Sequence, residues 1–440
     1  MSQDTLFPIV EVSAPKDAGT PGRAPARVQV PVRNQVETIL AALDDLVPEE
    51  HQARVVWAFV ERQDLSALYA RILATQDRPG HPAIAPEILV GLWLNATLDA
   101  VGSAREVARR CTDDVAYRWL CGGVSVNYHT LSDFRVDHAE FLDDLLTRDV
   151  AALMAEGLVD LARVAQDGMR VRASAGASSY RRRPTLEQCL EEARAHVDAL
   201  RRELEEAPES STPRQRAARE RAARERQARV EQALAKSEAI RATKSEKDQE
   251  KVRVSTTDPE VPVMKMADGG FRPAANVELA TDTGSQIVTG VDVTGRGSDL
   301  GEMPPMVEQH HQRYGMYPGE VLVDGGFAKK EDIETVSAPD QGCTVYAPVS
   351  KPKDAQRDRF EPLPGDSEAI AAWRRRMGTP EAQEIYKQRA STAECVNAIT
   401  RNRGLRQFTV RGLKKLKAVM LWYVLAHNLM RAHALRLAAA

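Results

Sequence analysis

The sequence is poor in the residues that mark several classes of protein. Its five cysteines are scattered and form no C-x-x-C pair, which argues against a disulfide framework and against a cysteine zinc site. Aromatic residues make up only 5% of the chain. The longest apolar stretch, residues 418–426, is too short to span a bilayer, and the first residues lack the pattern of a signal peptide. We therefore expect a cytoplasmic protein with no membrane partner.

The charge of the chain is nearly balanced, with a formal net charge of −3. Total charge therefore gives no sign of a nucleic-acid partner. The basic residues are nevertheless clustered, in residues 181–183, 214–229, 374–376 and 411–417, so local basic patches stay open. A chain of 440 residues with 43% apolar residues is long enough to bury a core in more than one packed unit.

The chain changes character along its length. Residues 1–34 are rich in Pro, Ala and Gly and are predicted to form a flexible leader. Residues 35–155 repeat apolar residues at helical spacing, which predicts a helical N-terminal domain. Residues 156–440 begin with a β-capable run that ends in an Asp-Gly pair, which we interpret as a turn.

Residues 156–440 are predicted to form a mixed α/β domain. Within it, residues 181–251 are dense in Arg, Glu and Ala and predict an inserted hairpin of two long helices after the first strand. Alternation predicts the other strands, and helical spacing predicts the other helices. The strands are expected at residues 158–168, 276–280, 286–293, 320–326 and 344–348, and the helices at residues 303–314, 380–401 and 411–436.

Two aspartates, Asp167 and Asp324, stand at the ends of predicted strands. The open edge of a sheet is where α/β domains place ligands and metals. The alternative interpretation is an ordinary turn, because Asp-Gly is a common turn dipeptide. Neither aspartate decides between the two interpretations by itself.

A predicted helix near the C-terminus carries Tyr386, Arg389, Glu394, Asn397 and Arg401. At about 100° per residue, Tyr386, Glu394 and Arg401 fall on one face, and Arg389 flanks it. One face thus carries an acid, bases and a phenol. The alternative is a solvated helix with ordinary ion pairs.

Taken in order, these motifs resemble the DDE transposases of bacterial insertion sequences, from about residue 35 to the end of the chain. The resemblance also rests on residues 81–91, 103–109, 117–120 and 129–135 of the helical region and on residues 254–259 after the insertion. It implies a ribonuclease H-like catalytic domain, with a mixed sheet flanked by helices, a helical N-terminal domain and a long helical insertion after the first strand.

By this resemblance Asp167, Asp324 and Glu394 are the catalytic carboxylates and the metal ligands. The family implies two Mg²⁺ ions for each site, with Mn²⁺ as a substitute. Phosphodiester cleavage needs an activated nucleophile and neutralisation of the charge on the leaving oxygen, which two such ions supply. Mg²⁺ prefers hard oxygen ligands, so a few carboxylates suffice to hold it.

Tyr386, Arg389 and Arg401 match the signature residues of the family's last catalytic helix. The sequence departs from the family's pattern in two ways. Arg401 stands where lysine is usual, and the interval from Arg389 to Glu394 is one residue longer than in the family's form. These departures bear on the roles of the two arginines.

Candidate DNA contacts lie in the helical N-terminal region, where a helix, a Gly turn and a second helix resemble a helix-turn-helix. The candidate residues are Arg105, Arg109, Asn127, His129, Thr130 and Arg135. The alternative is a helical bundle packed on the catalytic domain, with Trp119 and Phe134 as buried anchors. The arginine-rich insertion is open to three interpretations, as a phosphate contact, a solvated hairpin or a dimer contact.

The implied function is metal-dependent cleavage at the ends of an insertion sequence, followed by strand transfer into target DNA. The implied partners are double-stranded DNA, as terminal inverted repeats and as target, and a second copy of the chain in a homodimer on DNA at the nucleoid. Two alternatives stay open. One is a catalytically inactive, transposase-derived DNA-binding protein, and the other is a metal-dependent nuclease that only hydrolyses.

Overall fold

The computed structural model describes residues 40–74, 82–206, 212–352, 354 and 356–439, together with residues 33, 34 and 36. The predicted leader therefore lies outside the described residues, apart from its last two. The chain divides into two units, residues 1–42 and residues 43–440, and every described helix and strand belongs to the second.

The N-terminal part of this unit is helical, as predicted. Its helices are η1 (Asp44–Leu46), α1 (Gln52–Val60), α2 (Ser66–Tyr69), α3 (Pro86–Leu98), α4 (Ala104–Asp113), α5 (Val115–Cys121), α6 (Tyr128–Asp137) and α7 (Ala139–Ala155). Helix α3 is apolar on nearly all sides and its residues are almost all buried, which places it at the centre of this group. Phe134 is buried as an anchor, whereas Trp119 is only partly buried.

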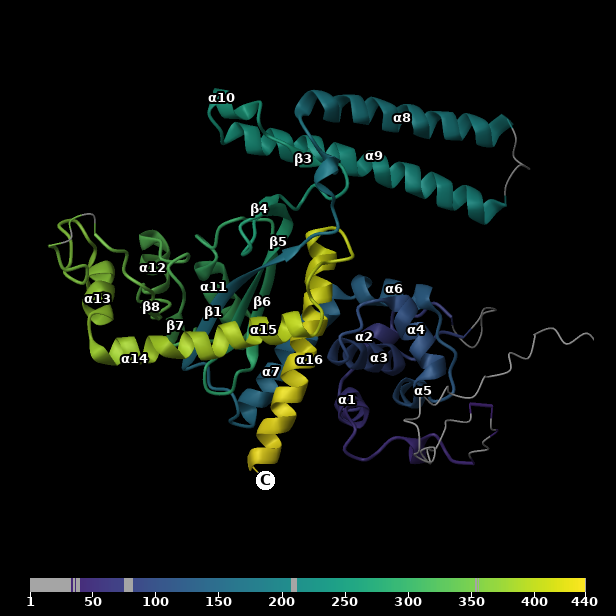
Figure 1. Ribbon diagram of the computed structural model, residues 1–440, viewed down its shortest axis with the longest axis horizontal. Helices are drawn as coiled ribbons and strands as arrows, with labels where there is room; N and C mark the ends of the chain where they lie inside the picture. The colour runs from purple at the N-terminus through teal and green to yellow at the C-terminus, as the bar shows by residue number, and fades with distance from the viewer. Residues whose placement is uncertain are drawn as a thin grey trace, which may run out of the picture. The chain divides into compact units, whose positions relative to one another are not determined.

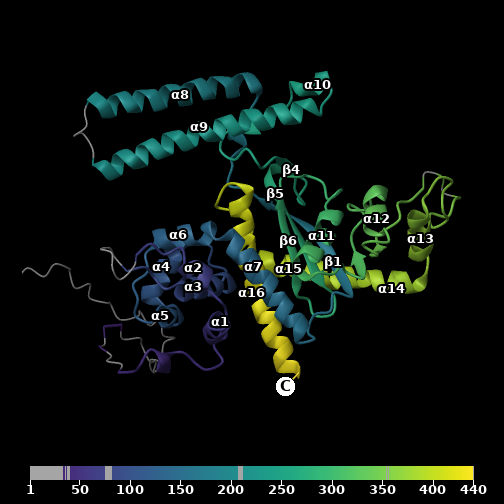
Figure 2. The ribbon, with the colours of Figure 1, turned by 180° about the vertical axis from the view of Figure 1, so that it is seen from behind.

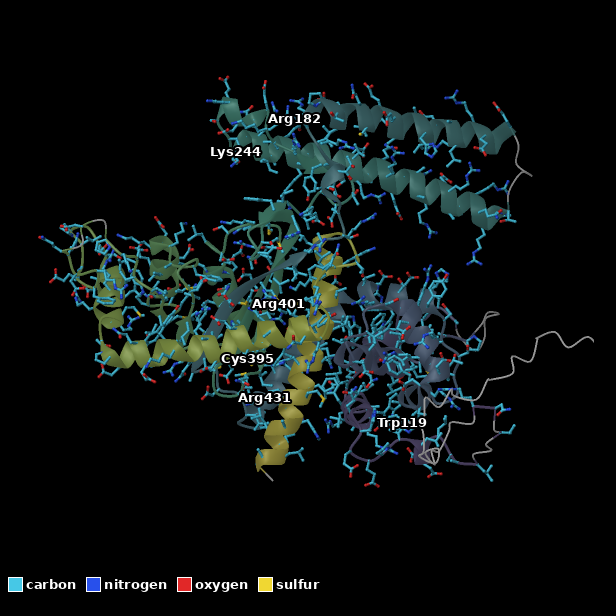
Figure 3. The ribbon with its side chains drawn as sticks, viewed as in Figure 1. Trp119, Arg182, Lys244, Cys395, Arg401 and Arg431 are labelled. Carbon is cyan, nitrogen blue, oxygen red and sulfur yellow. The ribbon has the colours of Figure 1, made fainter. Side chains whose placement is uncertain are left out.

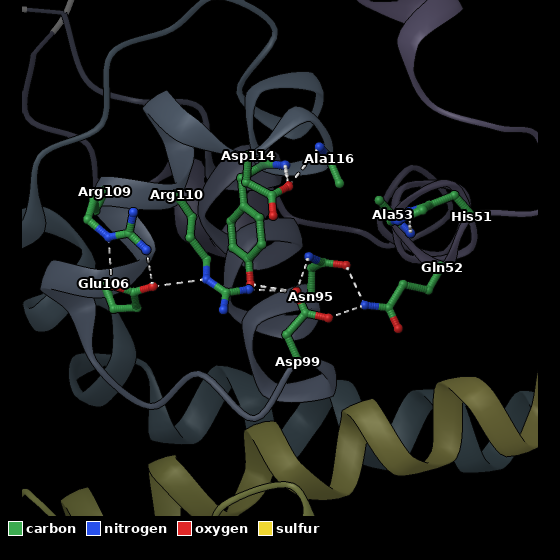
Figure 4. A network of polar contacts seen from close by, with 11 residues as sticks. His51, Gln52, Ala53, Asn95, Asp99, Glu106, Arg109, Arg110, Asp114 and Ala116 are labelled. Carbon is green, nitrogen blue, oxygen red and sulfur yellow. Dashed lines mark hydrogen bonds and ion pairs between the residues drawn. The ribbon is translucent and has the colours of Figure 1, made fainter. Parts of the chain in front are cut away.

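A polar network around Asp99 ties these helices together (Figure 4). Asp99 caps the end of α3 and accepts hydrogen bonds from Gln52 Nε2 of α1 at 2.5 Å and from the Tyr117 hydroxyl of α5 at 2.9 Å. Arg110 of α4 forms an ion pair with the same carboxylate at 3.5 Å. One partly buried carboxylate therefore fixes the relative positions of four helices.

The sheet has the order and directions of a ribonuclease H-like fold (Figure 1). Its strands lie in the order β6, β5, β1, β7, β8, and a short strand β4 extends the edge of β5. Strand β5 pairs antiparallel with β1 and β6, while β7 runs parallel to β1 and to β8. The strands are β1 (Arg163–Arg172), β4 (Val263–Lys265), β5 (Phe271–Asp282), β6 (Val288–Thr294), β7 (Glu320–Leu322) and β8 (Thr344–Tyr346).

Strand β1 begins later than predicted and continues further. Leu161 has a φ of 57°, and this left-handed turn keeps residues 158–162 out of the strand. Asp167 and Gly168 were predicted to end the strand as a turn. That prediction is wrong, because both residues lie in the middle of β1 and pair with Leu279 and Glu278 of β5.

Helices cover both faces of the sheet. They are α11 (Met303–Tyr314), α12 (Lys330–Val336), α13 (Glu368–Met377), α14 (Pro380–Arg389), η3 (Ala390–Glu394), α15 (Cys395–Asn402) and α16 (Leu413–Ala439). Neighbouring side chains of a strand point to opposite faces. Gln166 Nε2 donates to the backbone of Glu302, beside the start of α11, whereas Asp167 bonds to α15, so α11 and α15 lie on opposite faces (Figures 1 and 2).

The predicted insertion is a hairpin of two long helices lying side by side (Figures 1 and 2). Val197 and Leu200 of one helix pack against Ala223 of the other. The elements between β1 and β4 are η2 (Ala177–Ser179), β2 (Tyr180–Arg181), α8 (Arg183–Glu206), α9 (Pro213–Ala242), α10 (Glu246–Gln249) and β3 (Val254–Ser255). Strands β2 and β3 pair antiparallel and close the base of the hairpin.

Among the residues that the structure describes, no helix combines the length and the hydrophobicity needed to cross a membrane.

Asn428 of α16 holds the start of β6 in place, and this gives a test of the fold. Its fully buried amide accepts a hydrogen bond from Val288 N at 2.9 Å and donates to Val288 O at 2.8 Å. Asn428→Leu would leave both backbone groups buried and unpaired, so we expect the free energy of unfolding to fall by about 2–4 kcal/mol. Urea unfolding measures this loss.

Asn402→Ala, at an exposed position that ends α15, is the matched control and should change the free energy by less than about 0.5 kcal/mol. Equal losses for the two variants would show that the contact with Val288 does not stabilise the sheet.

Candidate active site

Asp167 occupies the middle of the central strand β1 and faces the α14–α15 side of the sheet. Its side chain is 17% exposed. Asn397 Nδ2 of α15 donates to one carboxylate oxygen at 2.8 Å, and Arg389 Nη1 lies 3.4 Å from the other. A carboxylate on a rigid strand is thus held by two side chains of the continuous helical segment that α14, η3 and α15 form.

Electrostatics place the other two predicted acids beside Asp167. Burial raises the pKa of Asp167 to about 6, and Arg389 opposes this shift. The negative charges of Asp324 and Glu394 raise the same pKa further. The geometry agrees, because Arg389 lies 3.4 Å from Asp167 and 2.8 Å from Glu394, and the parallel pairing of Ala165 with Leu322 sets Asp324 at the register position of Asp167.

Asp324 lies just beyond the carboxyl end of β7. Its carboxylate accepts a hydrogen bond from the Gly326 backbone N–H at 2.7 Å. Strands β1 and β7 are parallel neighbours, with Ala165 opposite Leu322, so each reaches its acid two residues later. The predicted position of Asp324 at a strand end is confirmed, although the strand itself stops at Leu322 rather than continuing through the predicted residue 326.

Gly168 is a glycine for a tertiary reason that the sequence does not reveal. A Cβ at this position would lie 2.7 Å from Asp299 Oδ1 and 2.9 Å from Glu278 Oε1. Asn276 Nδ2 bridges these two carboxylates at 2.8 and 2.7 Å. A side chain after Asp167 would therefore push these carboxylates apart and disturb the polar cluster.

The helix that carries Glu394 contains a π-turn at the place where its sequence departs from the family's pattern. Arg389 and Glu394 are five residues apart, which on an α-helix is about 140° around the axis. Residues Ala390–Glu394 instead form a π-helical turn, in which hydrogen bonds span one more residue. Arg389 Nη2 consequently lies 2.8 Å from Glu394 Oε1, so the extra residue is absorbed without loss of register.

The other two signature residues lie on either side of this turn. Burial raises the pKa of Tyr386, and the positive charge of Arg389 opposes this shift. Arg401 is exposed on α15 (Figure 3). With Arg170, Arg172 and Arg272 it lines a groove of about 440 Å³, which Gly168, Asp268 and Asp299 also line, and we call it the arginine groove.

The six N-terminal candidates lie in different environments. Arg109 is held by Glu106 and Asp113, each at 2.7 Å (Figure 4 shows Glu106 beside it). Asn127 caps α6 by accepting a hydrogen bond from the backbone of Thr130.

The remaining three candidates, Arg105, His129 and Arg135, line one pocket. Arg135 is only 8% exposed, unlike a residue that reads base edges from an exposed recognition helix.

The donor chemistry of the three acids suits a divalent cation. Carboxylate oxygens are the ligands that Mg²⁺ prefers, and a cation would offset the mutual repulsion of Asp167, Asp324 and Glu394. Within the described part of the chain, no three acidic, histidine or cysteine side chains stand close enough to enclose an ion. Glu394 is turned toward Arg389, whose guanidinium supplies the positive charge among the acids.

Two family models match the chain. A transposase domain matches residues 41–137, from the turn before α1 to the end of α6. A transposase DDE domain matches residues 341–433, which include Tyr386, Arg389, Glu394 and Arg401. No curated protein and no solved structure matches the chain. Asp167 and Asp324 lie between the two matches, so their assignment rests on the geometry above.

The Arg389 guanidinium should stabilise the site, because it offsets charge that is largely buried. Arg389 is 13% exposed and Asp167 17%. Arg389→Ala should lower the free energy of unfolding by about 3 kcal/mol, since it leaves a buried carboxylate without its cation. Urea unfolding at pH 8, where Asp167 is ionised, measures the loss.

Lys387→Ala removes a cation from the same helix whose pair with Glu384 is exposed, and it should cost less than about 1 kcal/mol. If both variants lost the same small free energy of unfolding, Arg389 would not stabilise the charge of Asp167.

Proposed function

We propose that this DNA transposase, whose chain carries a transposase domain and a DDE domain, cuts DNA at the ends of an insertion sequence and joins the freed ends to target DNA. Asp167, Asp324 and Glu394 are the proposed catalytic carboxylates. The observation that carries the proposal is that Arg389 contacts both Asp167 and Glu394, while the parallel neighbour of β1 places Asp324 at the register position of Asp167. The three acids are far apart in the sequence, so their proximity is a property of the fold.

The same three carboxylates are the proposed ligands for divalent metal ions, which DDE transposases use. We propose two Mg²⁺ ions, with Mn²⁺ as a substitute. Bound ions of this kind supply an activated oxygen nucleophile and neutralise charge on the leaving oxygen. The carboxylates differ in exposure, since Asp167 is 17% and Glu394 56% exposed. Asp167 therefore provides the fixed side of the site and Glu394 the side that DNA reaches.

The neighbouring side chains keep the carboxylates in position. Asn397 holds one oxygen of Asp167, so that carboxylate cannot rotate freely. Arg389 fixes Glu394 through the π-turn and also faces Asp167. When DNA and ions arrive, the Arg389 guanidinium is placed to exchange Glu394 for a phosphate oxygen, because it can donate to either.

The arginine groove is the proposed path of the DNA backbone next to the acids. Arg172 and Arg401 are exposed, and neither forms an ion pair with a carboxylate of the described chain. Arg170 donates to the backbone of Lys265 and Gly297, which fixes the wall of the groove. Unpaired arginines beside a phosphodiester-cutting centre are suited to phosphate oxygens.

Recognition of the terminal inverted repeats is assigned to the N-terminal helices, with Arg105, Arg109, Asn127, His129, Thr130 and Arg135 as the proposed contact region. A homodimer on DNA is proposed because transposition must bring two ends together. Its substrate is chromosomal DNA, so we expect the enzyme to act in the cytoplasm at the nucleoid.

The three carboxylates can be tested one at a time. Asp167→Asn, Asp324→Asn and Glu394→Gln keep the size of each side chain and remove its charge, so each should bind DNA but lose at least about 100-fold in Mg²⁺-dependent cleavage and joining. The assay uses labelled DNA that carries the element's flanking repeats.

Glu384→Gln is the control, because this acid is 73% exposed on α14 and pairs with Lys387 rather than with the site. Wild-type cleavage without joining would favour a hydrolytic nuclease, and binding without cleavage would favour an inactive derivative. Full activity in all three variants would refute the site.

The π-turn offers a test of register. Deleting the exposed Ser391 leaves Arg389 and Glu394 four residues apart, which an ordinary α-helix places on one face. The deletion should therefore keep cleavage within about tenfold of wild type.

Inserting one alanine after Ser391 should instead reduce cleavage by about 100-fold or more, because neither an α- nor a π-turn then aligns the pair. Circular dichroism and the unfolding midpoint check that both variants fold. Cleavage at the wild-type level in both variants would show that the pairing of Arg389 with Glu394 is not needed.

A further inference from the structure

A second anionic site is indicated by a pocket between the N-terminal helices and the segment after α15. The pocket has a volume of about 480 Å³. Its walls come from the start of α4, from α6 along its length, from residues 404–410, and from one residue of α3 and two of α16. We call it the Arg135 pocket, after the cation in its wall.

Arg135 is a buried charge without a matching acid. It is 8% exposed, and within the described chain it forms no ion pair with a carboxylate. Nη1 donates to the backbone of Gly102 at 2.5 Å, the guanidinium lies 4.7 Å from the Trp93 ring, and Nε has no partner. A buried cation with an unused donor is costly unless an anion accompanies it.

The opening of the pocket adds further groups that suit an anion. Arg105 is exposed, and its guanidinium lies 5.0 Å from the centre of the Tyr128 ring. The His129 ring packs on Tyr128 at 4.0 Å between ring centres. Ser132 adds an exposed hydroxyl, and Asp133 is the acid that shares the opening.

The pocket adjoins the arginine groove through one stretch of backbone. Arg172, which lines the groove, pairs as a β-bridge with Gln407, which lines the pocket. Phe408 N donates to Arg172 O at 2.8 Å, and Gln407 Nε2 donates to Ala173 O at 3.0 Å. The two concavities therefore lie on either side of a shared, fixed edge.

We propose that a backbone phosphate of the bound DNA enters the Arg135 pocket, where Arg135 and Arg105 neutralise it. The proposal rests on the proposed function for the identity of the ligand as DNA, and it assigns a second phosphate contact away from the carboxylates. One strand then passes from the acids along the arginine groove and across the edge at Gln407. In this arrangement Arg135 is a buried phosphate ligand and not a reader of base edges.

The test measures how DNA affinity depends on salt, without added metal, so that it is independent of cleavage. Each phosphate neutralised contributes about 0.9 to the slope of log affinity against log salt. Arg105→Ala should lower that slope by about 1 and weaken binding of a short duplex about tenfold at 0.1 M salt. Ser132→Glu, which adds a negative charge at the opening, should do the same without touching the buried Arg135.

Arg118→Ala is the matched control, because Arg118 is an exposed arginine on α5 that is not among the residues lining the pocket. It should leave the slope unchanged. A duplex with a single uncharged methylphosphonate linkage, moved along the strand, identifies the phosphate. At one position it should weaken wild type but not Arg105→Ala.

Unchanged slopes for Arg105→Ala and Ser132→Glu, with wild type binding DNA, would overturn the pocket and leave the proposed function standing. An equal loss of slope and affinity in Arg118→Ala would also overturn the pocket, since any exposed arginine would then have the same effect. Failure of wild type to bind DNA at all would count against the proposed function itself.

Discussion

The ionised carboxylate of Asp167 is the constraint on which the rest of the catalytic half depends. A charge in the middle of a central strand loses much of its hydration, and two further acids stand beside it. The fold offsets this with Asn397 and Arg389, both delivered by one helix. The helix must therefore lie in one register against the strand. Its π-turn keeps Arg389 and Asn397 on the side that faces Asp167.

This constraint explains which parts of the site the sequence could predict. Asp324 was found because it follows a short apolar strand and begins a Gly-Gly loop, which are both local signals. Helix α11 and the β5–β6 hairpin were predicted because periodicity marks them within their own residues. The environment of Asp167 was misread as a turn. Gly168 owes its identity to Asp299 and Glu278, which are remote in sequence.

Local sequence patterns do not predict the π-turn or the Arg135 pocket. Residues 390–394 contain neither glycine nor proline, so nothing in them predicts a break in the α-helix. The extra residue was visible in the sequence, but the contacts of Arg389 and Asn397 with Asp167 decide how it is accommodated. Arg135 lay in a motif that suggested an exposed base-reading helix. Its burial depends on Trp93 and on the segment after α15, which are tertiary neighbours.

The helical insertion is tolerated because its base is closed independently of the sheet. Tyr180 pairs with Ser255 and Arg181 with Val254, so the chain leaves and returns at one fixed point. When the ends of an inserted segment are fixed, its length costs little in closure entropy and does not alter the pairing of β1 with β5.

The charges of the insertion are also partly satisfied internally, as in the pair between Arg219 and Glu203 at 2.8 Å. Such exposed pairs stabilise by only about 1 kcal/mol or less. They would exchange readily for phosphates or for a second subunit. The hairpin can therefore bind phosphates or a second subunit without disturbing the site. The register of Asp167 is set by the pairing of β1 within the sheet.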